Sequence, residues 1–235
     1  CNHTVVNQDI TYHPPDCING PSKIMSGAFP IQRFDNRIAV NGDFQVADTR
    51  RFFSQLHQVT EQRGYQEIVL DFADCTAAFS SAMLPLCANV SLLREKGLDT
   101  TLILPNEARL QRLFLNTGWA NLMEPANYPA PNRKQNSRQF PVAQYKTHQE
   151  QELLLNELLE KLLAVIPNFS RSAFAAVEWA LNEISDNVIN HSQSPIGGLL
   201  QLSVFDSRYS RVEFTVADAG IGVPQTLRSA HPEIS

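Results

Sequence analysis

Apolar residues between positions 37 and 104 alternate between short continuous runs and longer segments with helical spacing. The short runs predict strands over residues 38–40, 68–72 and 101–104. Two helices are predicted between these strands, and the residues expected to face inward are Phe52, Leu56, Val59, Leu84, Leu86, Val90 and Leu93. Strands that alternate with helices form a parallel or mixed sheet with helices packed on it, so the first half is predicted to be an α/β domain.

Residues 148–165 carry leucines at helical spacing and are followed by Pro167. The leucines are Leu153, Leu154, Leu158, Leu159, Leu162 and Leu163. The pattern predicts an amphipathic helix that ends before the proline. The leucines pack either against their own domain or against a second copy of the chain, and periodicity does not separate the two. We expect packing within the domain, with a homodimer as the alternative.

A further helix and two strands are predicted after residue 168. Apolar residues at spacings of three and four predict a helix packed on a sheet, and they are Phe174, Val177, Leu181, Ile184 and Val188. Strands are predicted over residues 199–205 and 211–217, joined by a turn at 206–209. The second half is therefore predicted to be helices over an antiparallel sheet.

Four prolines lie among polar residues between the two patterned halves, at Pro125, Pro129, Pro131 and Pro141. This composition is typical of a linker. The predicted organisation is an N-terminal arm (residues 1–29), a first domain (30–125), a linker (126–147) and a second domain (148–235).

Composition narrows the class of protein. With 235 residues, 43% of them hydrophobic, the chain can form one large or two ordinary globular domains. A net charge of -5 and the lack of a basic stripe with interleaved aromatics argue against a nucleic-acid partner. No run of eighteen apolar residues exists, so no membrane partner is expected, and the cytoplasm is the expected location.

A polar stripe follows one face of the predicted helix at Glu183, Asn187 and His191. Residues four apart on a helix lie one turn above another, so these side chains share a face beside the apolar one. An Asn oxygen can serve as the single protein ligand of Mg²⁺ when phosphates and waters supply the rest. A carboxylate one turn earlier can activate a water or a hydroxyl.

A second group of candidate residues follows the last predicted strand, in Asp218-Ala-Gly220-Ile-Gly222. The Asp218 carboxylate can accept a hydrogen bond from an adenine amino group. Gly220 and Gly222 have no Cβ, so this loop can adopt φ > 0 and lie close to a ligand.

These two motifs together resemble the N-box and first glycine box of the GHKL ATPases, a family that includes histidine kinases, type II topoisomerases and anti-sigma serine kinases. The Glu183, Asn187 and His191 spacing is most similar to the anti-sigma serine kinases. The resemblance implies part of a Bergerat-fold α/β sandwich that binds ATP with Mg²⁺. It also implies that Glu183 is the base, Asn187 the metal ligand and Asp218 the adenine acceptor, with His191, Gly220 and Gly222 at the cofactor.

The family continues with an ATP lid and a second glycine-rich box, neither of which follows Gly222 here. Either the chain is a piece of a longer protein, which we expect, or its nucleotide site has decayed. Three activities stay open: a protein-serine kinase, an ATPase switch, and a non-catalytic partner-binding module.

The first domain is similar to STAS domains, the fold of anti-sigma factor antagonists. The likeness lies in residues 40–44, 68–72, 79–84 and 113–119. It implies a regulatory protein partner, such as a sigma factor or a STAS protein, and a phosphoacceptor serine at Ser81. The alternative is that Ser80 or Ser81 only caps the helix that begins there.

Overall fold

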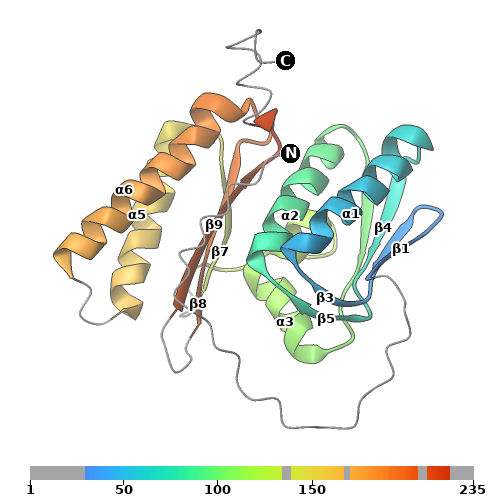
Figure 1. Cartoon of the computed structure of the whole chain (residues 1–235), viewed down its shortest axis with the longest axis horizontal. Coiled ribbons are helices and arrows are strands. Elements are labelled where there is room, and N and C mark those ends of the chain that lie inside the picture. Colours follow the sequence, from blue (N-terminus) through green and yellow to red (C-terminus); the bar gives the residue numbers. More distant parts are fainter. Residues whose placement is uncertain (1–29, 134–138, 167–169, 206–210, 223–235) are drawn as a thin grey trace.

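The computed structural model describes residues 30–133, 139–166, 170–205 and 211–222. They form a mixed α/β structure with parallel and antiparallel sheets (Figure 1). The predicted N-terminal arm, residues 1–29, lies outside the described residues. Below, residues 30–133 are called the N-terminal part, and the described residues between 139 and 222 are called the C-terminal part.

The N-terminal part contains a four-stranded sheet with the order β1-β2-β4-β6. Its strands are β1 (Ile31–Phe34), β2 (Arg37–Val40), β4 (Glu67–Asp71) and β6 (Asp99–Ile103). β1 pairs antiparallel with β2, whereas β2, β4 and β6 are parallel. A second parallel pair joins β3 (Gly42–Phe44) to β5 (Cys75–Ala78). The three strands predicted in this region are confirmed.

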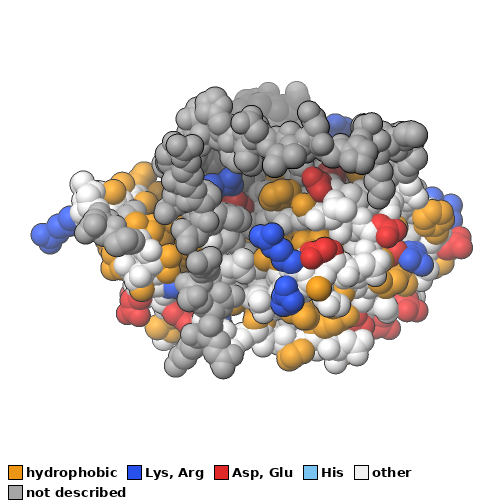
Figure 2. Space-filling model, turned by 90° about the horizontal axis from the view of Figure 1, so that it is seen from below, with side chains coloured by type: hydrophobic (Ala, Val, Ile, Leu, Met, Phe, Trp, Pro, Cys, Tyr) orange, Lys and Arg blue, Asp and Glu red, His pale blue; other side chains and the backbone are white. Residues whose placement is uncertain are grey.

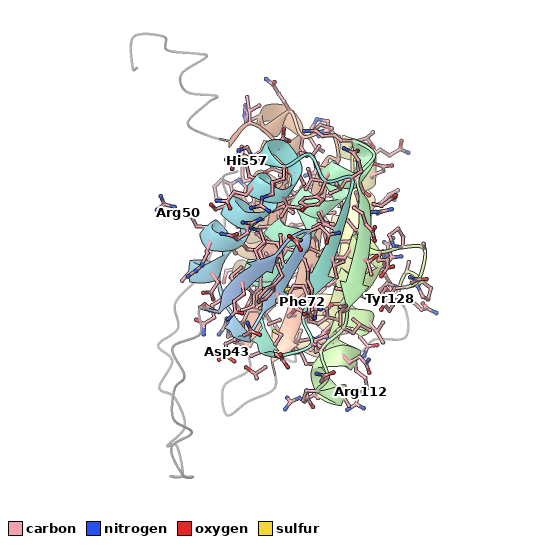
Figure 3. All side chains as sticks on the ribbon, turned by 90° about the vertical axis from the view of Figure 1, so that its right-hand side faces the viewer. Asp43, Arg50, His57, Phe72, Arg112 and Tyr128 are labelled. Atoms are coloured by element: carbon pink, nitrogen blue, oxygen red, sulfur yellow. The ribbon has the colours of Figure 1, made fainter. Side chains whose placement is uncertain are left out.

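Four helices accompany these strands: α1 (Val46–His57), α2 (Ser80–Glu95), α3 (Ala108–Thr117) and α4 (Trp119–Met123). α1 continues as a π-helical segment, η1 (Gln58–Gln62). Buried aromatic rings, including Phe72 (Figure 3), form edge-on contacts in this core. Edge-to-face contacts are a favourable geometry for aromatic pairs.

The C-terminal part is a three-stranded antiparallel sheet with two helices on one face (Figure 1). The strands are β7 (Gln139–Tyr145), β8 (Gly198–Phe205) and β9 (Arg211–Asp218), in that order. The helices are α5 (His148–Val165) and α6 (Arg171–Asn187), and α6 continues as a π-helical segment, η2 (Val188–Ser192). This confirms the prediction of helices over an antiparallel sheet.

The predicted linker is wrong in its second half, because residues 139–145 form strand β7. Phe140, Ala143 and Tyr145 are buried in the core beneath α5 and α6. Pro141 lies where the pairing of β7 with β8 shifts register, on an edge strand. A proline is tolerated there because its missing N–H breaks no regular ladder bond. The C-terminal part therefore begins before residue 148.

Packing within the chain is confirmed for four of the six leucines predicted on α5. Leu154, Leu158, Leu159 and Leu162 are buried in one cluster together with Leu155, whereas Leu153 is 64% exposed. Leu163 on α5 and Trp179 on α6 are 49% and 67% exposed, and hydrophobic side chains are visible over this end of the molecule in Figure 2. In the same view, basic and acidic side chains are interspersed over the described surface.

Helix α2 lies between the two sheets (Figure 1), because one side faces β6 and another faces β8 and β9. The larger hydrophobic core includes Leu199 and Ala217 of the C-terminal sheet together with residues of α2. The two parts of the chain therefore share a core. None of the described helices has both the length and the apolar character needed to cross a membrane.

Candidate functional site

Helix α6 carries the predicted polar stripe. Its N-cap is Ser170, whose Oγ accepts a hydrogen bond from the Ala173 N–H at 3.2 Å. Glu183, Asn187 and His191 are all exposed, as a ligand-binding stripe requires. The helix widens into the π-helical segment directly after Asn187, so His191 lies in a wider turn than the one predicted. Such π-helical segments are frequent at functional sites.

The loop after β9 packs against the end of this helical segment. The Ile221 N–H donates to the Ser192 carbonyl at 2.8 Å, and the Ala219 N–H donates to Ser194 Oγ at 3.2 Å. A Cβ on Gly220 would lie 2.0 Å from the Ser192 oxygen, so only glycine fits there. Gly222 has φ of 73°, the positive value predicted for this loop. The structure thus brings the Asp218–Gly222 loop next to the His191 end of the stripe.

The Asp218 side chain is held by its own loop. Its Oδ1 accepts from the Gly220 N–H at 2.7 Å, and within the described residues no donor reaches Oδ2. Burial raises the pKa of this carboxyl, and the hydrogen bond from Gly220 partly opposes that rise. Among the described residues, Asp218 therefore has a second carboxylate oxygen without a donor, in a partly buried setting.

A buried polar network that sequence reasoning missed lies beneath the stripe. The Tyr145 hydroxyl donates to the Ser185 carbonyl at 3.2 Å, and Gln151 Nε2 donates to Ser185 Oγ at 2.8 Å. All three side chains are almost completely buried. Tyr145 lies in the segment that the prolines and polar residues predict to be a linker, so its burial is not evident from the sequence. Gln151 and Ser185 offered no sequence signal beyond polar residues at helical positions.

The described residues do not gather enough ligands to hold a metal ion by themselves. No group of three or more His, Cys, Asp or Glu side chains gathers among the described residues. Mg²⁺ bound together with a nucleotide needs only one or two protein ligands, since phosphates and waters complete its shell. The exposed amide of Asn187 can fill that role.

The predicted phosphoacceptor lies at a different place. α2 begins at Ser80, its N-cap is Phe79, and no side chain caps it, so the capping alternative for Ser80 or Ser81 is wrong. Ser80 is buried and its hydroxyl instead donates to Glu213 on β9. Ser81 is half-buried beside it.

Strand alternation places Ser81 and Asp218 on opposite sides of the C-terminal sheet. Glu213 faces α2, whereas Val216, two residues before Asp218, belongs to the core beneath α5 and α6. Successive side chains of a strand point to opposite faces, so Asp218 shares the face of Val216. The structure therefore does not bring the predicted phosphoacceptor to the other predicted site residues.

Comparisons with known proteins identify no relative. No protein-family model matches the chain. No curated protein and no solved structure matches it either.

Proposed function

We propose that the chain is an ATP-binding regulatory protein, in which a GHKL-like nucleotide site in the C-terminal part is joined to a STAS-like module in the N-terminal part. One observation carries the proposal. The Asp218 loop, in which Oδ2 of Asp218 has no donor among the described residues, packs by a backbone hydrogen bond on Ser192, next to the end of the stripe formed by Glu183, Asn187 and His191.

Each residue has a role that matches its setting. Asp218 accepts a hydrogen bond from the adenine amino group through Oδ2, while Gly220 keeps the carboxylate in place through Oδ1. Asn187 holds Mg²⁺, and His191 and Gly222 line the nucleotide. The bound Mg-ATP would supply an electrophilic phosphoryl group.

Glu183 is the proposed general base. It lies one helical turn before Asn187 and is exposed, so it can orient an incoming hydroxyl or a water. With a protein serine as acceptor the activity is that of a kinase, and with water it is that of an ATPase switch. Because Ser81 lies across the sheet from Asp218, a kinase of this architecture acts on another molecule rather than on its own Ser81.

Calorimetry of Mg-ATP binding tests the proposal. We expect Asp218→Ala to weaken binding at least about tenfold, because a site built to accept from the amino group loses its acceptor. Asp99→Ala removes an exposed carboxylate at the start of β6 and serves as the matched control. Equal affinity of the Asp218→Ala variant and the parent chain would refute the site.

A non-catalytic partner-binding module is the second candidate, and the contact between α2 and the C-terminal sheet favours it. The Ser80–Glu213 and Trp119–Gln201 hydrogen bonds join this sheet face to helices α2 and α4 of the N-terminal part. Glu183→Ala separates the candidates, because a kinase or ATPase loses turnover while a binding module keeps its partner affinity. The sigma factor or STAS protein partner implied by the family resemblance would be the probe.

A further inference from the structure

Three residues form a row across the C-terminal sheet. Tyr145 on β7 pairs with Gly198 on β8, and Gly198 pairs with Asp218 on β9. A Cβ on Gly198 would lie 2.3 Å from Cζ of Tyr145 and 2.5 Å from its hydroxyl oxygen. The tyrosine ring therefore lies across Gly198, and only glycine at that position leaves room for it.

This placement brings the tyrosine hydroxyl toward the proposed site. Burial is the main cause of a raised pKa at Tyr145, and the carboxylates of Asp218 and Asp186 add to it. The hydroxyl consequently stays protonated and acts as a hydrogen-bond donor. Its acceptor is the carbonyl of Ser185, which lies on α6 between Glu183 and Asn187.

The Ser185 carbonyl is at the point where α6 changes from α-helix to π-helix. The Val188 N–H also donates to it, and Val188 is the first residue of η2. A π-turn pairs each N–H with the carbonyl five residues back instead of four, so carbonyls at the transition lose their regular donor. A side chain that inserts into the helical ladder is a known cause of such a local change. The Tyr145 hydroxyl reaches this carbonyl from outside the helix.

The side chain of Ser185 is also held by hydrogen bonds. Ser185 Oγ donates to the Leu181 carbonyl at 2.6 Å and accepts from Gln151 on α5 at 2.8 Å. Ser185 is thus held by β7, α5 and its own helix at once. A buried network that satisfies all of its members makes a rigid support.

From these contacts we propose that Tyr145 is a positioning residue of the nucleotide site. Its hydroxyl holds the α-to-π transition after Ser185, and its ring spans Gly198, so that Asn187 and His191 keep a fixed placement relative to Asp218. This inference rests on the proposed function, because it assigns a support to that site.

The test is Tyr145→Phe, which removes only the hydroxyl. Tyr128→Phe is a matched control, since the Tyr128 hydroxyl donates to the Leu102 carbonyl at 3.3 Å in the N-terminal part (Figure 3). Amide hydrogen exchange of the free chains gives the first measurement. We expect exchange of residues 187–192 to rise about fivefold in Tyr145→Phe, the effect of one lost buried hydrogen bond, and not in Tyr128→Phe.

The second measurement compares affinities for Mg-ATP and Mg-ITP, whose base lacks the amino group. A merely structural role would weaken both equally. Misplacement of Asp218 relative to α6 would lower the ATP:ITP affinity ratio, by about threefold or more. We expect that lower ratio in Tyr145→Phe and an unchanged ratio in Tyr128→Phe.

The outcomes separate the two claims. Unchanged exchange at 187–192 in Tyr145→Phe, or an unchanged ATP:ITP ratio in a chain that binds ATP, overturns the positioning role. Failure of the parent chain to bind ATP overturns the proposed function. Faster exchange of residues 187–192 in Tyr145→Phe would then still support the role of Tyr145 in stabilising the π-helical segment.

Discussion

The two faces of the C-terminal sheet are both buried, but by different means. The face toward α5 and α6 is apolar, with Leu200, Leu202 and Val216 in one cluster. The face toward the N-terminal part is mixed, because Leu199 and Ala217 share it with the buried polar residues Gln201, Ser203 and Thr215. The residues of each face alternate along the same strands, so one sequence segment serves two kinds of interface.

The two faces contribute differently to the stability of the fold and to the relative orientation of the two parts of the chain. Apolar burial is favourable in any orientation and grows with the area removed from water. Buried polar groups cost free energy unless specific partners reach them. On the polar face one such partner comes from the N-terminal part, because Trp119 Nε1 donates to Gln201 Oε1 at 2.8 Å. Within β8, Gln201 Nε2 in turn donates to Ser203 Oγ at 3.2 Å. The polar face therefore fixes how the two parts sit together.

The largest expected effect comes from the apolar face. Leu158 on α5 is fully buried, and Leu158→Ala should lower the free energy of unfolding by about 2–5 kcal/mol, since it loses transfer free energy and leaves a cavity. Leu153 on the same helix is 64% exposed, so Leu153→Ala should change the free energy of unfolding by less than about 0.5 kcal/mol. Urea unfolding measures both variants. Similar losses for the two leucines would show that α5 packs differently.

A smaller effect is expected from the polar face. Trp119→Phe removes the indole donor and leaves the Gln201 oxygen buried without it, which should cost about 1–3 kcal/mol. Trp179→Phe is the matched change at an exposed tryptophan and should cost less than about 0.5 kcal/mol. Urea unfolding of both variants, with small-angle scattering of the folded chains, checks the prediction. An unchanged unfolding free energy for Trp119→Phe would remove the polar face as a determinant of orientation.

The sequence predicted elements well where one face is apolar. The spacing of Phe174, Leu181 and Val188 located α6, because helical periodicity is set by local burial. It missed β7, since Pro141 and the neighbouring polar residues resemble a linker. The strand forms because a bulge in its pairing accommodates the proline. Its partner β8 lies more than fifty residues away, so no local pattern reveals the pairing.

The candidate site was also predictable only in part, because some of its contacts depend on residues far apart in the sequence. The exposed stripe and the Asp218 loop follow from short motifs, and the structure places the loop next to the His191 end of the stripe. The support from Tyr145 depends on the register of β7, β8 and β9, which no local pattern encodes. The burial of Gln201 and Ser203 likewise depends on a helix from another part of the chain, so those residues resemble a solvated face in the sequence.

The smallest expected effect concerns Asp218, the carboxylate that faces the otherwise apolar side. Burial raises its pKa in the folded state, so the folded chain binds this proton more tightly than the unfolded chain. Stability from this group is therefore present at low pH and is lost as the pH rises from the unfolded pKa, about 3.9, through the raised folded value.

Asp218→Asn keeps an oxygen for the Gly220 N–H and removes the charge, so it should be more stable than the parent chain at pH 7. The gain should be smaller than either loss above, because the group is partly solvated. It should shrink toward pH 3, and Asp99→Asn, the same change at an exposed carboxylate, is the control. Thermal unfolding of the three chains between pH 3 and pH 7 measures this, and a variant less stable than the parent at pH 7 would mean that the charged carboxylate supports the fold rather than a ligand.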